Sequence, residues 1–247
     1  MLMPSKASEF LGSDKGIATM VFANRWIAGE ALGDKLLNQL FIQQTAGVDI
    51  LVLSIPRGGV VVGAAVAKIL QCTHDVVVAK KIGMPGHPEA AVGAIAEDGP
   101  AILSPDMPIW YLDPGGPLDF SAAQTRAKIA AYSKKFHAGR TLDVRAKTVI
   151  LVDDGIATGE TMKAALLWLK SKSEAERPQH ILIAVPVGSP KAIADLTSLA
   201  DQVICLSTPR RFWAVSQFYL DFRQISDEEV RQYLPGKHLP GKRLNLN

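Results

Sequence analysis

Cysteine is scarce in this chain of 247 residues, which contains only two, Cys72 and Cys205. Each lies in or beside an apolar run and neither belongs to a CxxC motif, so we expect buried free thiols rather than a disulfide. No pair of histidines in the sequence has the spacing of zinc ligands. The sequence therefore gives no sign of a disulfide-stabilised fold or of a structural zinc site.

Long hydrophobic segments are also missing. The first 16 residues hold no apolar core of signal-peptide length. The most apolar stretch, residues 50–70, is interrupted near its middle by Pro-Arg-Gly-Gly, and a charge there is costly in a lipid bilayer. We interpret this stretch as a strand, a turn and a helix, and we expect a soluble, cytoplasmic protein with no membrane partner.

Charge of one sign is not in large excess. The formal net charge is +3, and the basic residues are spread along the chain rather than gathered in the stripe typical of nucleic-acid-binding proteins. The Walker loop GxxxxGK[ST], the dinucleotide loop GxGxxG and the hydrolase elbow GxSxG are absent from the sequence. We therefore expect no nucleic-acid partner, and the mild positive balance suits an anionic small substrate.

The apolar residues that are present are mostly aliphatic, and aromatic residues make up only 6% of the chain. This composition is typical of a parallel sheet covered by helices. Short apolar runs alternate with helical patterns, which predicts an α/β fold with a doubly wound, mostly parallel sheet. Strands are expected at 49–55, 75–79, 148–152, 181–185 and 202–206, and helices at 22–41, 59–70, 121–137, 161–170, 190–199 and 227–234.

Parts of the chain lack this alternation. Residues 1–20 look irregular, and the tail 235–247, which repeats Leu-Pro-Gly-Lys, is predicted to be basic and disordered. The folded domain is therefore expected at 21–234. Within it, residues 82–116 are dense in glycine and proline. Because a structureless loop of that length is unusual in a compact domain, a β-excursion or mobile flap is predicted there, followed by a helix that Ser121 caps.

The most informative segment is Val-Ile-Leu-Val-Asp-Asp-Gly-Ile-Ala-Thr-Gly-Glu-Thr, residues 149–161. A strand ends at two acids, Asp153 and Asp154, a short loop follows, and a helix then begins. Ligands of open α/β sheets bind beyond the carboxyl ends of strands, and the free N–H groups at a helix start suit a phosphate. Two adjacent carboxylates can accept hydrogen bonds from two neighbouring hydroxyls. The pattern favours a sugar phosphate over a capped helix without a ligand.

In this interpretation the diol of the sugar lies on the two acids and its phosphate lies in the loop. Glycines let the backbone curl around the phosphate, and the threonines add hydroxyl donors. The residues expected to bind the phosphate are Gly155, Ile156, Ala157, Thr158, Gly159, Glu160 and Thr161.

Segment 149–161 resembles the signature with which type I phosphoribosyltransferases bind 5-phosphoribosyl-1-pyrophosphate (PRPP). A second segment, Ser-Ile-Pro-Arg-Gly-Gly-Val at 54–60, resembles the pyrophosphate loop that follows the first core strand of these enzymes. Gly58 and Gly59 expose amides at a helix start, and Arg57 offers a fork of donors to phosphate oxygens.

Two lysines extend the resemblance. Lys80 and Lys81 stand where the family places a basic residue near the pyrophosphate, and we expect one of them to face the site because side chains alternate along a strand. Residues 80–99 resemble a subgroup of phosphoribosyltransferase-like proteins without an assigned base. The resemblance covers about residues 22–230 and implies a small hood built from terminal segments.

The resemblance also implies a flexible loop within 82–101 and base recognition near 208–221. The acids of that loop, Glu89, Glu97 and Asp98, either help to position Mg²⁺ or the base, or are simply solvated. Phe212 and Trp213 are the candidates for stacking on the base, and packing is the alternative role for both. Arg210 and Arg211 stand where relatives carry an acid and a proline, which indicates an anionic acceptor or only a basic surface.

The function implied by the resemblance is that of a phosphoribosyltransferase, a pentosyltransferase of nucleotide salvage. It transfers the 5-phosphoribosyl group of PRPP to a nitrogenous base and releases pyrophosphate, with Mg²⁺ held mainly through PRPP rather than by the protein. The expected catalytic residues are Asp153, Asp154, Arg57 and Lys81, and Asp154→Asn is expected to leave folding intact while cutting turnover steeply. A homodimer is expected. The alternative is a regulatory protein that senses PRPP or a nucleotide without catalysing the reaction.

Overall fold

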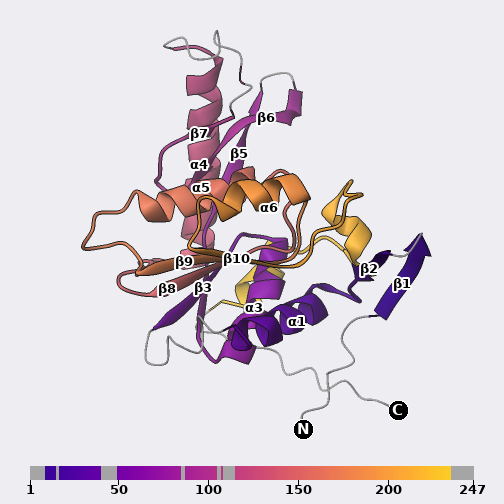
Figure 1. The fold of residues 1–247 in the computed structure, drawn as a ribbon. Coiled ribbons are helices and arrows are strands. Elements are labelled where there is room, and N and C mark those ends of the chain that lie inside the picture. The colour runs from indigo at the N-terminus through magenta and orange to yellow at the C-terminus, as the bar shows by residue number, and fades with distance from the viewer. Residues whose placement is uncertain are drawn as a thin grey trace.

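A five-stranded parallel sheet forms the core of the computed structural model, in the order β10-β9-β8-β3-β4 (Figure 1). Its strands are β3 (Ile50–Ser54), β4 (Thr73–Val76), β8 (Thr148–Val152), β9 (His180–Val187) and β10 (Gln202–Ser207). The structure describes residues 9–14, 17–39, 49–84, 87–104, 107 and 115–234. The tail predicted to be disordered, 235–247, lies outside the described residues.

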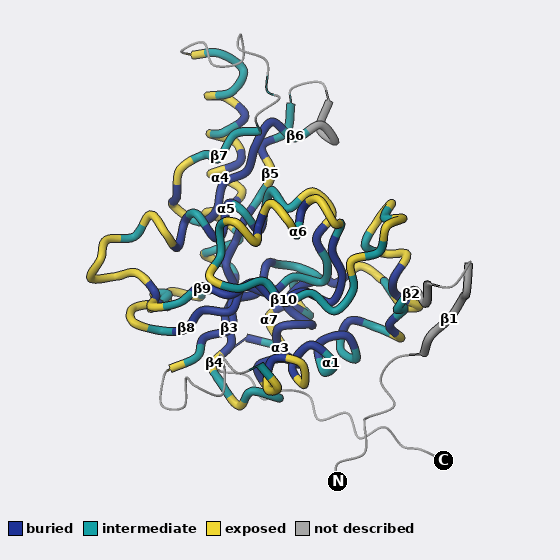
Figure 2. The backbone as a smooth tube through the Cα atoms, viewed as in Figure 1, coloured by how far each residue is buried: buried dark blue, intermediate teal, exposed yellow. Residues whose placement is uncertain are grey.

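Helices cover both faces of this sheet. Figure 1 shows α5 (Glu160–Lys170) and α6 (Pro190–Thr197) on one face, and α1 (Arg25–Leu37) and α3 (Gly58–Leu70) on the other. Side chains of β8 alternate between them: Val149 and Leu151 pack against α5, whereas Ile150 and Val152 pack toward α1 and α3. The doubly wound α/β fold is therefore confirmed, and the buried backbone follows these strands in Figure 2.

The strand order reverses at one point, between β3 and β8. From β3 the chain runs outward to β4, and from β8 it runs the other way to β9 and β10. Such a switch point leaves a crevice beyond the carboxyl ends of the two strands, which is where ligands of open α/β sheets bind. The segments that follow β3 and β8 are the two that the sequence singled out.

A second, antiparallel sheet projects from the core beside α4 (Pro117–His137) (Figure 1). It consists of β5 (Ala79–Met84), β6 (His87–Ala96) and β7 (Ile102–Leu103), and we refer to these three strands as the flap. The predicted β-excursion is confirmed, but it begins earlier than residue 82. The strand predicted at 75–79 was wrong in extent, because the core strand ends at Val76 and the flap begins at Ala79.

The start of α4 also differs from the prediction. Its cap is Gly116, with Pro117 in the first turn, so Ser121 is not the N-cap but a buried residue of the helix. Proline suits a first helical turn because its missing N–H would have no partner within the helix.

Residues 208–226, with η2 (Val215–Phe218), form a small hood that packs on the segment following β2. The Phe22 amide donates to the Phe218 carbonyl at 2.9 Å, and the Leu220 amide donates to the Phe22 carbonyl at 2.9 Å. A short helix, α7 (Asp227–Gln232), follows the hood. These contacts agree with a hood built from terminal segments.

The prediction that residues 1–20 are irregular was wrong where the structure describes them. β1 (Glu9–Asp14) pairs antiparallel with β2 (Ile17–Val21). The sequence of β1 contains glycine, serine and aspartate and does not alternate, so its pairing with β2 is not visible in the local pattern.

Both cysteines are free, and burial raises the pKa of Cys72 to about 12 and that of Cys205 to about 11. No helix among the described residues has the length and apolarity that a bilayer crossing requires.

Candidate functional site

Two carboxyl groups stand directly after β8. The Asp154 amide donates to Oδ1 of Asp153 at 2.8 Å, and the Asp154 side chain is only 14% exposed. Burial, together with the neighbouring Asp154, raises the pKa of Asp153 well above its usual range. Burial also raises the pKa of Asp154, and the nearby Arg25 guanidinium opposes that rise. The pair is thus a shielded acceptor group at the switch point of the sheet.

The loop after β3 lies directly against these acids. A Cβ atom on Gly58 would overlap Oδ2 of Asp154 and would lie 2.7 Å from its Cγ. A Cβ atom on Gly59 would lie 2.8 Å from both Cα and Oδ1 of Asp153. Only glycine permits this approach. The structure thus brings the predicted pyrophosphate loop and the predicted diol acids together.

Arg57, the basic residue of that loop, precedes α3, and the peptide bond between Pro56 and Arg57 is cis. Its Nη1 lies 3.8 Å from Oδ1 of Asp227 at the start of α7. At that distance the ion pair is loose. The guanidinium of Arg57 therefore has N–H donors that can bind an anionic ligand.

Sequence reasoning missed Arg25, in the first turn of α1. Its Nε donates to Oδ2 of Asp154 at 2.7 Å, and its side chain is 9% exposed. Its Nη1 donates to the Arg223 carbonyl at 2.9 Å, and its guanidinium lies 3.8 Å from the ring centroid of Phe222. One signal was available: a cation in the first turn opposes the helix dipole, so its presence there needs another cause.

Tyr219 of the hood was also missed. Its hydroxyl donates to the Asp154 backbone carbonyl at 2.5 Å, and burial raises its pKa well above the usual range. The hydroxyl therefore stays protonated and remains a donor. The hood is thereby bonded to the end of β8, next to the two acids.

The predicted phosphate loop has two parts: an anchor, Ile156, which is bonded to neighbouring segments, and a crest, Ala157 and Thr158, which is exposed. The Ile156 amide donates to the Val187 carbonyl at 2.9 Å, and its own carbonyl accepts from the Ser189 amide at 2.8 Å, so Ile156 fixes the loop to β9. Ala157 and Thr158 are exposed at the crest. Gly159 has φ of +81°, a left-handed conformation that favours glycine, and α5 begins at the next residue. The crest and the start of α5 thus face outward.

The two lysines of β5 point in different directions. Nζ of Lys81 lies 3.1 Å from Oγ1 of Thr158 and 3.2 Å from Oε2 of Glu160, and its side chain is 45% exposed. Nζ of Lys80 instead lies 4.1 Å from the ring centroid of Tyr132. Burial, followed by the nearby charge of Arg57, lowers the pKa of Lys80. Lys81 therefore contacts the predicted phosphate loop, whereas Lys80 lies on the side of Arg57 and the predicted pyrophosphate loop.

A cleft of about 680 Å³ borders the outer side of the phosphate loop. The flap contributes residues 102–104 to its wall, the loop contributes 157–160, and α6 contributes much of the remainder. Ser104 Oγ donates to Oε1 of Glu160 at 3.4 Å where flap and loop meet. Asp153 and Asp154 do not line this cleft, so it meets the paired acids only through the loop.

Comparison with known proteins shows which family this chain matches. The family model described as "Phosphoribosyl transferase domain" matches residues 24–223. The chain belongs to this family. The membership expected from the resemblance of segments 54–60 and 149–161 is therefore confirmed.

The relatives of this phosphoribosyl transferase domain match most of the length of the chain. Two curated Mycobacterium tuberculosis proteins, from strains CDC 1551 / Oshkosh and H37Rv, carry a provisional phosphoribosyl transferase name. Each is 36% identical over 219 residues, which are 88% of this chain and 47% of the relative. The chain therefore spans about half the length of these relatives. The crystal structure of TT1426 from Thermus thermophilus is 38% identical, covers 87% of this chain and 98% of its own, and has a TM-score of 0.70.

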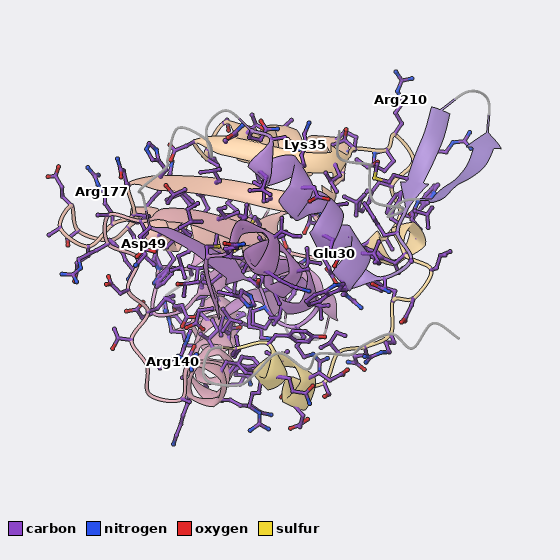
Figure 3. All side chains as sticks on the ribbon, turned by 90° about the horizontal axis from the view of Figure 1, so that it is seen from below. Glu30, Lys35, Asp49, Arg140, Arg177 and Arg210 are labelled. Carbon is purple, nitrogen blue, oxygen red and sulfur yellow. The ribbon has the colours of Figure 1, made fainter. Side chains whose placement is uncertain are left out.

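The predicted base-binding residues of this phosphoribosyl transferase domain are separated in the structure. Phe212 packs on Phe218 inside the hood, with ring centroids 5.3 Å apart, whereas Trp213 is 85% exposed. Asp221 accepts from the Arg223 amide at 3.1 Å and so holds a turn. Arg210 extends away from the body of the molecule in Figure 3, at the end opposite Asp49.

Two acids of the flap have structural partners. Oε1 of Glu97 accepts from the Val78 amide at 2.6 Å, and Oε2 accepts from Oγ of Ser133 at 2.7 Å. Asp98 accepts from the indole of Trp168 at 2.7 Å. Both acids therefore fasten the base of the flap to the core. Glu97 is only partly exposed, whereas Asp98 is exposed, as expected for a solvated acid.

His137 completes this fastening. It lies 3.3 Å from Glu97 and 3.7 Å from Asp75, and its side chain is 12% exposed. The adjacent carboxylates of Asp75 and Glu97 raise its pKa from 6.5 to about 9. A raised folded-state pKa stabilises the fold below pH 6.5, and this contribution is lost as the pH rises through 9.

We expect His137→Gln to lower the free energy of unfolding by about 2 kcal/mol near pH 6.5 and by much less above pH 9. Urea unfolding at a series of pH values measures this difference. His180→Gln, at a half-exposed histidine of β9, is the control and should give a small, constant difference. A His137→Gln penalty that does not change with pH would contradict a charged His137 in this cluster.

Proposed function

We propose that this protein is a phosphoribosyltransferase that transfers the 5-phosphoribosyl group of PRPP to a nitrogenous base and releases pyrophosphate. The observation that carries the proposal is the contact of Gly58 with Asp154 and of Gly59 with Asp153. A pyrophosphate on the first loop and a ribose diol on the acids would then belong to one molecule. The phosphate loop, on the same strand end as the acids, supplies the third contact that PRPP requires.

The three parts of PRPP have different partners in this proposal. The 5′-phosphate lies on the crest and the start of α5, from Ala157 to Thr161, with Ile156 as the anchor of the loop. The diol lies on Asp153 and Asp154. The pyrophosphate lies on Arg57 and the amides of Gly58 and Gly59, with Lys80 beside them.

Magnesium fits this set of residues as a companion of PRPP. The described residues hold no group of three or more His, Cys, Asp or Glu side chains that could bind a metal. The paired carboxyls of Asp153 and Asp154 offer oxygens, which Mg²⁺ prefers, but one oxygen of Asp154 is already bonded to Arg25. We therefore propose that Mg²⁺ would be held mainly through PRPP itself, and that it would supply positive charge for the leaving pyrophosphate.

The protein groups promote the transfer through charge and position. The bond from C1 to the pyrophosphate oxygen breaks, and its electron pair leaves with pyrophosphate. Positive charge develops on the ribose ring next to the Asp153–Asp154 pair, which stabilises it electrostatically. A ring nitrogen of the base then bonds to C1 and loses its proton to water. Arg57 and Lys80 stabilise the charge that collects on the leaving group.

The two lysines give a test of how PRPP is oriented. We expect Lys81→Met to weaken the binding of ribose 5-phosphate about 10-fold or more, because Lys81 contacts the phosphate loop. We expect Lys80→Met to weaken the binding of pyrophosphate by a similar factor and to leave ribose 5-phosphate unaffected. Calorimetry with the two ligands measures both, and each variant is the control of the other. The reverse pattern would contradict the orientation.

The experiment that tests the proposed function is pyrophosphate release from PRPP and Mg²⁺ with pooled purine, pyrimidine and pyridine bases. Release by the wild type identifies a transferase, and splitting the pool identifies the base. PRPP binding without release from any base would favour the regulatory alternative. If calorimetry detects no PRPP binding, the proposed function is wrong.

A further inference from the structure

Arg25 is the point at which three parts of the candidate site meet. It belongs to α1, on the face of the sheet opposite α5, and is almost completely buried. Its three partners, Asp154, the Arg223 carbonyl and the Phe222 ring, belong to the segment after β8 and to the hood. A Cβ atom on Gly58 would lie 2.9 Å from its Nε, so the pyrophosphate loop passes beside it as well.

We propose that Arg25 is a positioning residue that couples closure of the hood to the orientation and charge of Asp154. This inference rests on the proposed function, because it gives Asp154 the role of holding the ribose diol. The guanidinium is planar and its donors are fixed relative to one another. A displacement of the hood carbonyl at Arg223 therefore rotates the group that holds Oδ2 of Asp154.

Two contacts connect Asp154 to the hood, one directly and one through Arg25. The Tyr219 hydroxyl holds the Asp154 carbonyl from the hood, while Arg25 holds the Asp154 side chain. The hood segment 219–223 thus bonds directly to the main chain of Asp154 and reaches its carboxylate through Arg25. Because the base is expected to lie under the hood, its arrival can reach Asp154 through Arg25 without a direct contact.

The charge of Arg25 also bears on titration of the site. The charged or titratable groups facing Asp154 are Arg25 from α1, Asp153 from the segment after β8 and Tyr219 from the hood. Burial favours the protonated form of Asp154, and Arg25 favours the carboxylate. Removing the Arg25 charge should therefore raise the pKa of Asp154 and move the acid limb of kcat/KM to higher pH.

Three substitutions separate positioning from folding. We expect Arg25→Gln to lower kcat/KM for PRPP about 10- to 100-fold, with the acid limb moved to higher pH. Arg25→Lys keeps the charge but cannot reproduce the fork of donors, so it should restore the acid limb and recover only part of the rate. Phe222→Leu removes the stacking ring alone and should lower kcat with the acid limb unchanged.

Thermal unfolding and PRPP calorimetry from pH 5.5 to 8.5 accompany the kinetics. An Arg25 with only a structural role would lower the unfolding temperature of both Arg25 variants without moving the acid limb or the pH dependence of PRPP binding, and that result would overturn the inference. If Arg25→Gln does not fold, Arg25→Lys and Phe222→Leu decide the inference through kcat: a lower kcat in both folded variants supports positioning, and wild-type kcat in both overturns it. If the wild type itself does not bind PRPP, the proposed function fails first, which distinguishes the two failures.

Discussion

Asp154→Asn is expected to reduce pyrophosphate release from PRPP about 100- to 1,000-fold. In the proposed function the substitution removes a carboxylate charge beside the developing positive charge of the ribose, and a single preorganised electrostatic contact is typically worth that factor. The assay is steady-state pyrophosphate release with the base found in the pooled experiment. Turnover close to that of the wild type would remove the diol-holding role from Asp154.

The same substitution is also expected to affect stability, which corrects the expectation drawn from the sequence that folding stays intact. Arg25 is 9% exposed and bonds directly to Asp154. Asparagine leaves that guanidinium with its bond to the Arg223 carbonyl and its contact with Phe222, but without a counter-charge. Removing one partner of a buried ion pair is strongly destabilising, so we expect a loss of about 3 kcal/mol and a fall of about 6–12 °C in Tm.

Asp153→Asn is the matched control. Burial and the neighbouring Asp154 already raise the pKa of Asp153, so its neutral form costs the fold little. Asparagine also keeps the oxygen that accepts from the Asp154 amide. We expect this variant to lose less than about 1 kcal/mol of stability but to lose turnover, because half of the diol-holding pair is gone. Kinetics at a temperature where all three proteins are folded then separates chemistry from stability.

The sequence predicted those parts of the site that follow a strand. The acids after β8 and the glycines after β3 could be found because a short apolar run, a polar turn and a helix start are local patterns. Parallel pairing then brings such strand ends to one edge of the sheet. The side of β5 on which Lys80 and Lys81 lie could not be predicted, because it depends on where the flap leaves the core.

The residues missed were those that reach the site from distant parts of the chain. Arg25 and Tyr219 contact Asp154 across 129 and 65 residues of sequence, respectively. No local pattern encodes such contacts, since they depend on how the hood packs on α1. The acids Glu97 and Asp98 lie in a turn, as their Gly- and Pro-rich segment suggested, but their tertiary bonds to Val78 and Trp168 could not be predicted from that pattern.

Gly58→Ala is the substitution that tests the approach of the pyrophosphate loop to the acids. We expect it to weaken PRPP binding and to lower turnover by about 100-fold, since a misplacement of about 1 Å can cost that much. An added Cβ would overlap Oδ2 of Asp154, and that oxygen cannot move away without breaking its bond to Arg25. Either the loop retreats from the acids or the acid leaves its partner, and both results disturb the pyrophosphate and diol positions together.

Intrinsic helix propensity gives the opposite expectation, which makes the test informative. Gly58 is the first residue of α3, and alanine is favoured over glycine in helices by up to about 1 kcal/mol. Gly139→Ala is the control, since Gly139 has φ of +83° and nothing within 4 Å of an added Cβ. It should cost about 1 kcal/mol of stability through backbone strain and leave PRPP binding unchanged. Wild-type PRPP affinity in Gly58→Ala would mean that close approach of this loop to Asp154 is not needed to bind PRPP, and the pyrophosphate would then have to lie elsewhere.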